Sequence, residues 1–330
     1  MNHQKIKPVL EGLFVTILIL AGLGYWFYPY YLSKTINPVA PQIQPVKEPT
    51  QPLSLAEYQD YLNSLDRSQP AAVAGGIRVL ERSIPHYSGK DADLAFLAFN
   101  TFYIEAQNHC NETFWRNEAL IAKIRSATQG MTADQIHEYL NQPSALQKDP
   151  EIKEFARQIS SGGFVLKSRA GNFYLVENPD FFYNKFSKYL SESLREFLDL
   201  RRRETAEGFT ANGDLLISFK KIGERIINWE VYLDKYPDSP LKELADYHRQ
   251  LYLGVFLFGM EDSRTFERKR LKPELKAVYE DFSERFSATK SGDLIGRYYE
   301  VLRANDYQYT KEVADFLETN QVQIYPGLQL

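Results

Sequence analysis

Few residues in this sequence have the types and spacing that chemistry requires. Ser287-Ala288-Thr289-Lys290 fits the S-x-x-K pattern, in which a lysine one helical turn after a serine helps to activate the hydroxyl as a nucleophile. The companions of that pattern are missing, because Lys290-Ser291-Gly292, the nearest match to K-T-G, overlaps the motif and cannot form an opposite wall. A four-residue pattern with two free positions is common by chance. We therefore expect this segment to form a turn between two helices.

Histidine chemistry is not indicated either. No two of the five histidines lie at i and i+4, so no metal site can be recognised. His248 falls on the apolar face of a predicted helix, where a core histidine with satisfied hydrogen bonds is expected more often than a catalytic base. The sequence therefore predicts no catalytic, cofactor-binding or metal-ligating residue, and no cofactor. The five are His3, His86, His109, His137 and His248.

The strongest local charge feature is Arg201-Arg202-Arg203, which follows a helix predicted over Phe181–Leu200. Cations at the carboxyl end of a helix interact favourably with its dipole, which is the structural interpretation. The functional interpretation is a contact with an anionic partner or a lipid head group. Both interpretations remain open from the sequence.

Composition limits the classes of function. The chain has 330 residues, is 44% hydrophobic and has a formal net charge of -4, which allows a sizeable core and argues against general nucleic-acid binding. Its single cysteine, Cys110, cannot form an intrachain disulfide and is expected to be buried.

Residues 9–33 are predicted to form a transmembrane anchor. The stretch from Gly12 to Ser33 has no charged side chain, and as a helix it would span roughly 33 Å, enough to cross a hydrocarbon core of about 30 Å. Six aromatic residues between Tyr25 and Tyr31 suit the bilayer–water boundary and favour an uncleaved anchor over a signal peptide. The sequence therefore predicts a single-pass protein that uses this segment to contact the membrane.

The charges beside the anchor predict its orientation. Lys5 and Lys7 precede the span, whereas Lys34 is alone beyond it, so the rule that cytoplasmic flanks are positive places residues 1–8 in the cytoplasm. The bulk of the chain is then expected outside the cytoplasm, on the plasma (inner) membrane.

A proline-rich stalk is predicted over residues 34–53. Five prolines lie between Asn37 and Leu53, a density that forbids a helix and favours an extended polyproline II rod of roughly 50 Å. A docking site for an aromatic-lined groove is the less favoured alternative.

From Ser54 the pattern becomes helical, and residues 54–160 are predicted to form an N-terminal helical subdomain. Ser54 and Glu57 form the S-x-x-E capping box that begins the first helix. A β-hairpin is predicted over 161–178, because β-formers flank Arg169-Ala170-Gly171-Asn172, and it is expected to pack on helices. The helices are expected at Leu55–Leu65, Pro70–Ile84, Asp91–Cys110, Phe114–Ala127 and Thr132–Asn141, with one more beginning at Asp149-Pro150.

Residues 179–330 are predicted to form a C-terminal subdomain of repeated helix pairs. One apolar stripe ends near Pro237, and Ser239-Pro240 begins a second helix. About fifty residues on, the layout returns, as expected for helix pairs that bury their apolar faces by stacking. The matching positions are Trp229 and Tyr279, Tyr232 and Phe282, Tyr236 and Phe286, Leu244 and Leu294, His248 and Tyr298, and Leu251 and Val301.

The segment WEVYLDKYPDSPLKELADYH, within residues 229–252, resembles the helix–turn–helix junction of tetratricopeptide-like repeats in bacterial envelope proteins, and residues 279–302 carry a fainter copy. The resemblance implies a curved helical surface that binds proteins or peptides without catalysis. The predicted fold class is all-α, with solenoid-like helix pairs and one β-hairpin, preceded by the transmembrane helix.

We therefore expect a membrane-anchored extracytoplasmic scaffold that is not an enzyme and that presents a helical surface to a protein partner in a cell-envelope assembly. The alternative is an envelope enzyme, for example one acting on peptidoglycan, whose site cannot be recognised in the sequence. A groove lined by aromatics without convergent titratable groups would favour the scaffold, and a cleft with two facing carboxylates would favour the enzyme.

Overall fold

The structure is a computed structural model, and it describes residues 47–141, 148–169, 171–211 and 214–322. The predicted cytoplasmic tail, the anchor at 9–33 and most of the stalk lie outside these ranges. Within them, no helix is both long and apolar enough to cross a membrane. The described residues divide into two compact units between Arg195 and Glu196, and each unit is described by itself.

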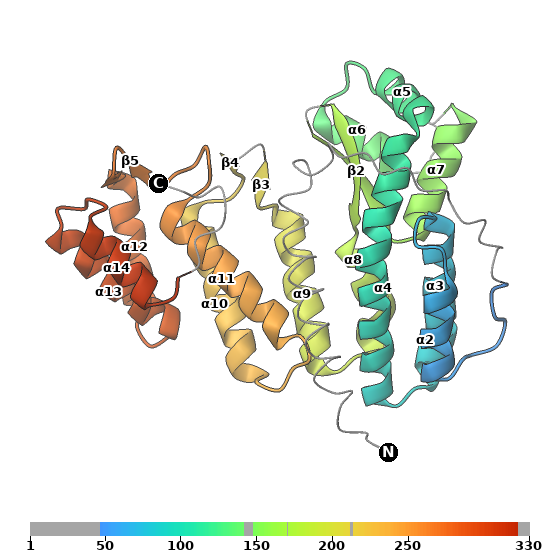
Figure 1. Ribbon diagram of the computed structural model, residues 1–330, viewed down its shortest axis with the longest axis horizontal. Helices are drawn as coiled ribbons and strands as arrows, with labels where there is room; N and C mark the ends of the chain where they lie inside the picture. The colour runs from blue at the N-terminus through green and yellow to red at the C-terminus, as the bar shows by residue number, and fades with distance from the viewer. Residues whose placement is uncertain (1–46, 142–147, 170, 212–213, 323–330) are drawn as a thin grey trace. The chain divides into compact units, whose positions relative to one another are not determined.

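The described part is mostly helical, as the sequence predicts, and Figure 1 shows the order of its elements. Three two-stranded antiparallel hairpins accompany the helices in these residues, where the sequence predicts only one. The two additional hairpins have strands of two residues each, too short to give an alternating apolar pattern.

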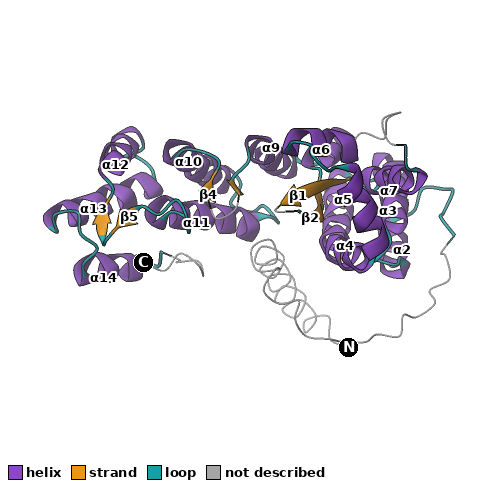
Figure 2. Ribbon diagram, turned by 90° about the horizontal axis from the view of Figure 1, so that it is seen from above, coloured by secondary structure: helices purple, strands orange, loops and turns teal. Residues whose placement is uncertain are grey.

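The first unit is built around one long helix. Helix α4 packs against α2, α3 and strand β2, and Figure 2 shows α2, α3, α4 and α7 end on. The elements are α2 (Leu55–Ser64), α3 (Pro70–Ser83), η1 (Ile84–His86), α4 (Gly89–Arg116), α5 (Glu118–Ala127), α6 (Ala133–Asn141), α7 (Pro150–Ser161), β1 (Phe164–Arg169), β2 (Asn172–Glu177), α8 (Pro179–Phe186) and η2 (Ser187–Tyr189).

Helix α2 begins as the sequence predicts. The Ser54 hydroxyl accepts the backbone N–H of Glu57 at 3.4 Å, and the Glu57 carboxylate accepts that of Ser54 at 2.8 Å. The glycines inside α3 allow α2 to approach closely, because a Cβ on Gly76 would lie 3.2 Å from Leu62 Cδ2. The Gly75-Gly76 pair therefore serves helix packing and does not interrupt α3.

The boundary between α4 and α5 differs from the prediction. Helix α4 runs without a break to Arg116, where separate helices were expected to end at Cys110 and begin at Phe114. The chain turns at Asn117, whose side chain accepts the backbone N–H of Leu120 at 3.1 Å and caps α5.

The predicted hairpin is present and packs on α4. Phe164 pairs with Glu177 at one end of the ladder, and Arg169 pairs with Asn172 at the turn. The buried Asn111 of α4 donates to Leu175 O at 3.0 Å and accepts the Leu175 N–H at 2.7 Å. The division between the two units falls after Arg195, so the hairpin and α8 both belong to the first unit.

The last residues of the predicted stalk are attached to α3. The Glu48 carboxylate pairs with Arg78 and with Arg82, the latter at 2.9 Å. The backbone N–H of Leu53 donates to Ser83 Oγ at 2.9 Å. Residues 48–53 therefore form part of the folded unit, which shortens the stretch that can act as a free spacer.

Two antiparallel helix pairs dominate the second unit, α10 with α11 and α12 with α13, and α14 packs on α13. Two pairs of matching aromatic residues are buried, Trp229 with Tyr279, each 0% exposed, and Tyr232 with Phe282. The elements are α9 (Glu192–Glu207), β3 (Thr210–Ala211), β4 (Asp214–Leu215), α10 (Phe219–Lys235), α11 (Lys242–Phe258), β5 (Phe266–Glu267), β6 (Arg270–Leu271), α12 (Pro273–Arg285), α13 (Lys290–Ala304) and α14 (Lys311–Thr319).

The prediction of one continuous helix over Phe181–Leu200 is wrong. The chain forms α8, a 3₁₀ turn at Ser187–Tyr189 and then α9, which continues to Glu207. The apolar spacing is compatible with one continuous helix, so periodicity alone does not reveal the break.

Candidate functional site

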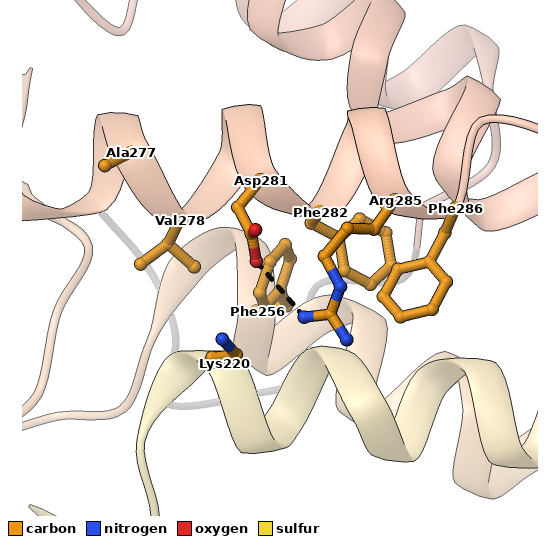
Figure 3. A pocket seen from close by; sticks show the side chains of 8 residues that line it. All are labelled: Lys220, Phe256, Ala277, Val278, Asp281, Phe282, Arg285 and Phe286. Atoms are coloured by element: carbon orange, nitrogen blue, oxygen red, sulfur yellow. Dashed lines mark hydrogen bonds and ion pairs between the residues drawn. The ribbon is translucent and has the colours of Figure 1, made fainter.

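An aromatic pocket lies in the second unit, where α10, α11 and α12 meet. Its volume is about 230 Å³, and Figure 3 shows its lining. The side chains come from one residue of α10, one of α11, five of α12 and the residue that follows α12. They are Lys220, Phe256, Ala277, Val278, Asp281, Phe282, Arg285 and Phe286.

Three phenylalanine rings form the aromatic part of the lining, which also includes Ala277 and Val278. The ring of Phe282 lies 5.0 Å from that of Phe256 and 5.0 Å from that of Phe286, measured between centroids. Gly223 of α10 makes room for this arrangement, because a Cβ there would lie 2.8 Å from Phe282 Cδ2. A glycine inside a helix costs about 0.5–1 kcal/mol relative to alanine, and here it allows close approach of a large ring.

Three charged side chains surround the apolar lining. Asp281 and Arg285 extend from α12 toward α10 and form an ion pair at 3.2 Å, while Lys220 comes from α10 (Figure 3). The Arg285 guanidinium also lies over the Phe286 ring, 5.0 Å from its centroid. Two cations and one carboxylate thus line the pocket, and no second carboxylate faces Asp281 within it.

The first helix pair contains a matching arrangement whose charges are satisfied internally. Lys235 lies over the ring of Tyr236, 4.9 Å from its centroid, as Arg285 does over Phe286. Glu196 of α9 contacts both residues, because its carboxylate pairs with Lys235 Nζ at 2.8 Å and accepts the Tyr236 hydroxyl at 2.6 Å.

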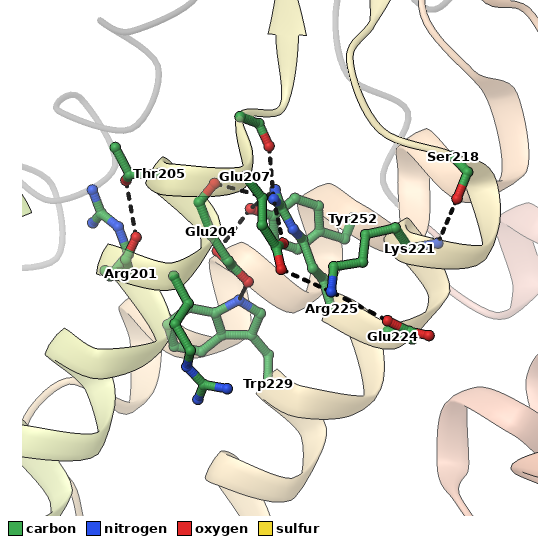
Figure 4. Close-up of polar contacts among 12 residues, drawn as sticks. Arg201, Glu204, Thr205, Glu207, Ser218, Lys221, Glu224, Arg225, Trp229 and Tyr252 are labelled. Atoms are coloured by element: carbon green, nitrogen blue, oxygen red, sulfur yellow. Dashed lines mark hydrogen bonds and ion pairs between the residues drawn. The ribbon is translucent and has the colours of Figure 1, made fainter.

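A second cluster of polar groups is buried among α9, α10 and α11 (Figure 4). The Glu204 carboxylate accepts Trp229 Nε1–H at 2.8 Å and the Tyr252 hydroxyl at 2.8 Å. Arg225 is 1% exposed and donates to Glu207 at 3.0 Å and to the Gly208 carbonyl at 2.7 Å. Burial raises the pKa of Glu204, and the hydrogen bond from Tyr252 partly opposes that shift. Glu204 binds the side chains of the core residues around it, which indicates a structural role.

His248 lies beside this cluster and does not match the prediction in full. Its ring stacks on the buried Trp229 at 4.8 Å, and its two ring nitrogens are buried without a hydrogen-bond partner in the described residues. Burial lowers the pKa of His248 well below its usual value, and Arg201 and Arg225 lower it further. The prediction that its hydrogen bonds are satisfied is therefore wrong, and the ring is held neutral.

The three arginines at 201–203 lie inside α9 and not at its carboxyl end. The last turn of this helix contains no basic residue, so the interpretation of a dipole cap is wrong. Arg202 and Arg203 both pair with Asp199, at 2.7 and 3.1 Å. Arg201 lies near the buried cluster, where its charge acts on Glu204 and on His248. The contact of these arginines with an anionic partner stays a prediction.

The S-x-x-K segment forms the turn that the sequence predicts. Helix α12 ends at Arg285 and α13 begins at Lys290, with Thr289 as its N-cap. Lys290 Nζ pairs with Asp234 at 2.8 Å. In the residues that the structure describes, no group of three or more His, Cys, Asp and Glu side chains could hold a metal ion.

One difference between the two helix pairs in the sequence points to the pocket. Tyr232 and Tyr236 match Phe282 and Phe286 at the fifty-residue spacing, and the second pair has lost both hydroxyls. An apolar ring at a helix end where its counterpart is polar indicates a different environment, but only the structure shows that this environment is open.

Comparison with family models, with curated proteins and with solved structures finds no match to this chain. The arrangement of its own residues is therefore the basis for the function proposed below.

Proposed function

We propose that this chain is a membrane-anchored extracytoplasmic helical scaffold, held by residues 9–33, that presents a binding surface to a protein partner in a cell-envelope assembly. The observation that carries the proposal is the aromatic pocket between α10, α11 and α12. Pockets of aromatic and apolar side chains bordered by polar groups are where protein interfaces concentrate their binding energy.

The size of the pocket supports recognition of a side chain. Sites for cofactors and drug-sized molecules usually occupy about 300–1,000 Å³, whereas this pocket has about 230 Å³. Its chemistry agrees with that use, since the single carboxylate in its lining is paired with Arg285. Hydrolysis of a glycosidic bond requires two carboxyl groups that flank the bond, and the pocket does not supply them.

The repeated helix pairs supply a second line of support. Stacked pairs bury their apolar faces against one another and leave an extended surface, the architecture that the resemblance to tetratricopeptide-like repeats implies. The cytoplasmic placement of residues 1–8 and the location in the plasma (inner) membrane are part of the same proposal and rest on the sequence alone.

The test is affinity purification of the full-length chain from detergent-solubilised membranes of its own cells, after carbonate extraction of those membranes. We expect the chain to stay with the membrane in carbonate and to be recovered with the same partner in proportionate amounts in repeated preparations. Release by carbonate would contradict the anchor, and recovery of the chain alone after chemical cross-linking would contradict the scaffold.

A further inference from the structure

We propose that the aromatic pocket is specific for an acidic-apolar element of a partner protein. This element is an aromatic or branched aliphatic side chain with a carboxylate beside it. This proposal rests on the proposed function and names the chemistry of the partner at that site. The apolar lining selects the side chain, and the cations around it select the carboxylate.

The volume limits the ligand to one side chain. An apolar cavity of about 150 Å³ lined by Leu, Ile and Phe is large enough to bind benzene. The pocket, at about 230 Å³, therefore holds one aromatic ring or one branched aliphatic side chain, with space for the bonds that attach it to a main chain. Phe256, Phe282 and Phe286 line this space, and aromatic rings pack favourably against another ring.

The charges around the lining favour an acidic neighbour. Asp281 satisfies Arg285, but Lys220 is exposed and has no ion pair with a described residue, so the pocket carries a net positive charge. A basic ligand would bring like charge to Lys220 and Arg285 and is disfavoured.

The protein itself shows how a carboxylate occupies this geometry. Beside the first helix pair, Glu196 of α9 binds the Lys235 ammonium and the hydroxyl of Tyr236, over whose ring Lys235 lies. Asp246 of α11 lies fifty residues after Glu196, and it pairs with Arg249 of its own helix at 2.7 Å. Arg285 therefore has only Asp281 of its own helix as a carboxylate partner, Lys220 has none among the described residues, and a partner's carboxylate can pair with Lys220.

The experiment uses a phage-displayed library of random peptides, panned against the full-length chain in lipid nanodiscs. Synthetic copies of the enriched peptides are then titrated against the wild type and against two variants, Ala277→Arg and Lys220→Glu. The exposed Ala277 lines the pocket, so an arginine there fills it without disturbing the core. Lys220 lies in the first turn of α10, where a glutamate is favourable for the helix.

The controls match each variant in structure. Ala304→Arg adds the same side chain at an exposed position on α13, and Lys242→Glu makes the same charge reversal in the first turn of α11. Neither position lines the pocket.

We expect the enriched peptides to share an aromatic or branched aliphatic residue with Asp, Glu or a terminal carboxylate next to it. Ala277→Arg should weaken their binding at least tenfold, and Lys220→Glu by about fivefold, as expected for reversal of one exposed charge. The controls should bind as the wild type does. Changing the peptide's acid to its amide should remove the effect of Lys220→Glu.

Enrichment of basic peptides would overturn the proposal, and so would failure to enrich any peptide or peptides that bind Ala277→Arg as tightly as the wild type. These outcomes are separate from the test of the scaffold. If cells expressing Ala277→Arg still yield the wild-type partner in full, the scaffold stands and the pocket is not its contact site.

Discussion

The carboxylate of Glu230, on α10, accepts the backbone N–H of Ser291, in the first turn of α13, at 3.0 Å. It also accepts the N–H of Lys290, at 2.6 Å. The first backbone N–H groups of a helix have no partner inside it, and the helix dipole makes that end favourable for a negative charge. Glu230 is 4% exposed, so this contact joins the first helix pair to the second in a site shielded from water.

Replacing this carboxylate should weaken the second unit considerably. Glu230→Ala leaves one buried and one partly buried N–H group without their acceptor. The expected cost is about 2–4 kcal/mol in the free energy of unfolding, because hydrogen bonds to charged groups are worth about 1.5–3 kcal/mol. Denaturation by urea, followed through the fluorescence of Trp229, measures the loss. Trp229 lies on the same helix, in the core.

The fifty-residue spacing supplies the control for this prediction. Glu280 occupies the matching position on α12 but is exposed. Glu280→Ala should therefore change the free energy of unfolding by less than about 0.5 kcal/mol. Equal losses for the two variants would show that the link between Glu230 and α13 does not support the unit.

Gly223→Ala should damage the pocket through Phe282. The added methyl group would lie 2.8 Å from Cδ2 of that ring, so Phe282 must move, and it is 4% exposed and packed against Phe256. Overpacking of a core costs about 1–3 kcal/mol, of which the better helix propensity of alanine recovers up to about 1 kcal/mol. Thermal unfolding should show a lower Tm.

The same substitution at an uncrowded helical glycine, Gly296, separates the effect of packing on the Tm from the effect of helix propensity. A Cβ on Gly296 would meet Ser283 Cβ at 3.5 Å, an ordinary contact. Gly296→Ala should therefore keep or raise the Tm. If Gly223→Ala does the same, the pocket lining is less tightly packed than the distances indicate.

The features that could be read from the sequence are those set by neighbours along the chain. The Ser54–Glu57 capping box, Pro150 at a helix start and the hairpin turn before Asn172 each depend on a few adjacent residues. The fifty-residue spacing also allowed the two helix pairs to be placed, because it repeats Trp229 as Tyr279.

The features that escaped prediction depend on distant partners or on local breaks. Apolar periodicity continues across Asn117 and across Ser187–Tyr189, so the caps and turns there compete with a pattern that looks unbroken. The pocket depends on the absence of a side chain at Gly223 opposite Phe282, and no spacing rule connects those two positions.

Cys110 should be almost inert toward thiol reagents in the folded chain. It is buried, as predicted, and burial together with the nearby Asp66 raises the pKa of its thiol to about 12. Only the thiolate reacts, so at pH 8 labelling should be at least about a thousandfold slower than in the denatured chain, where the pKa is about 8.5. The rate of labelling by iodoacetamide, with and without urea, measures the ratio. Rapid labelling without urea would show that α4 opens or that the thiol is accessible.

The stability of the second unit should fall as the pH is lowered below about 6.5, because His248 stays neutral in the folded state. Its folded pKa is depressed by burial and by the charges of Arg201 on α9 and Arg225 on α10, so in this pH range the imidazole binds a proton in the unfolded chain but not in the folded chain. The free energy of unfolding then decreases by up to about 1.4 kcal/mol for each pH unit. Glu204 has the opposite effect on stability. Burial raises its folded pKa, so its contribution to the free energy of unfolding is lost as the pH rises through that folded pKa.

His248→Phe isolates the contribution of the histidine, because it keeps a ring against Trp229 and leaves Glu204 in place. We expect the variant to lose less stability than the wild type between pH 7.5 and 5. At pH 7.5 it should be about 1 kcal/mol more stable, since it no longer buries two ring nitrogens without partners. Urea titrations at five pH values measure both effects, with His109→Gln, at an exposed position on α4, as the control. If the free energies of unfolding of His248→Phe and the wild type change with pH in parallel, His248 can be protonated in the folded chain, and water reaches its ring.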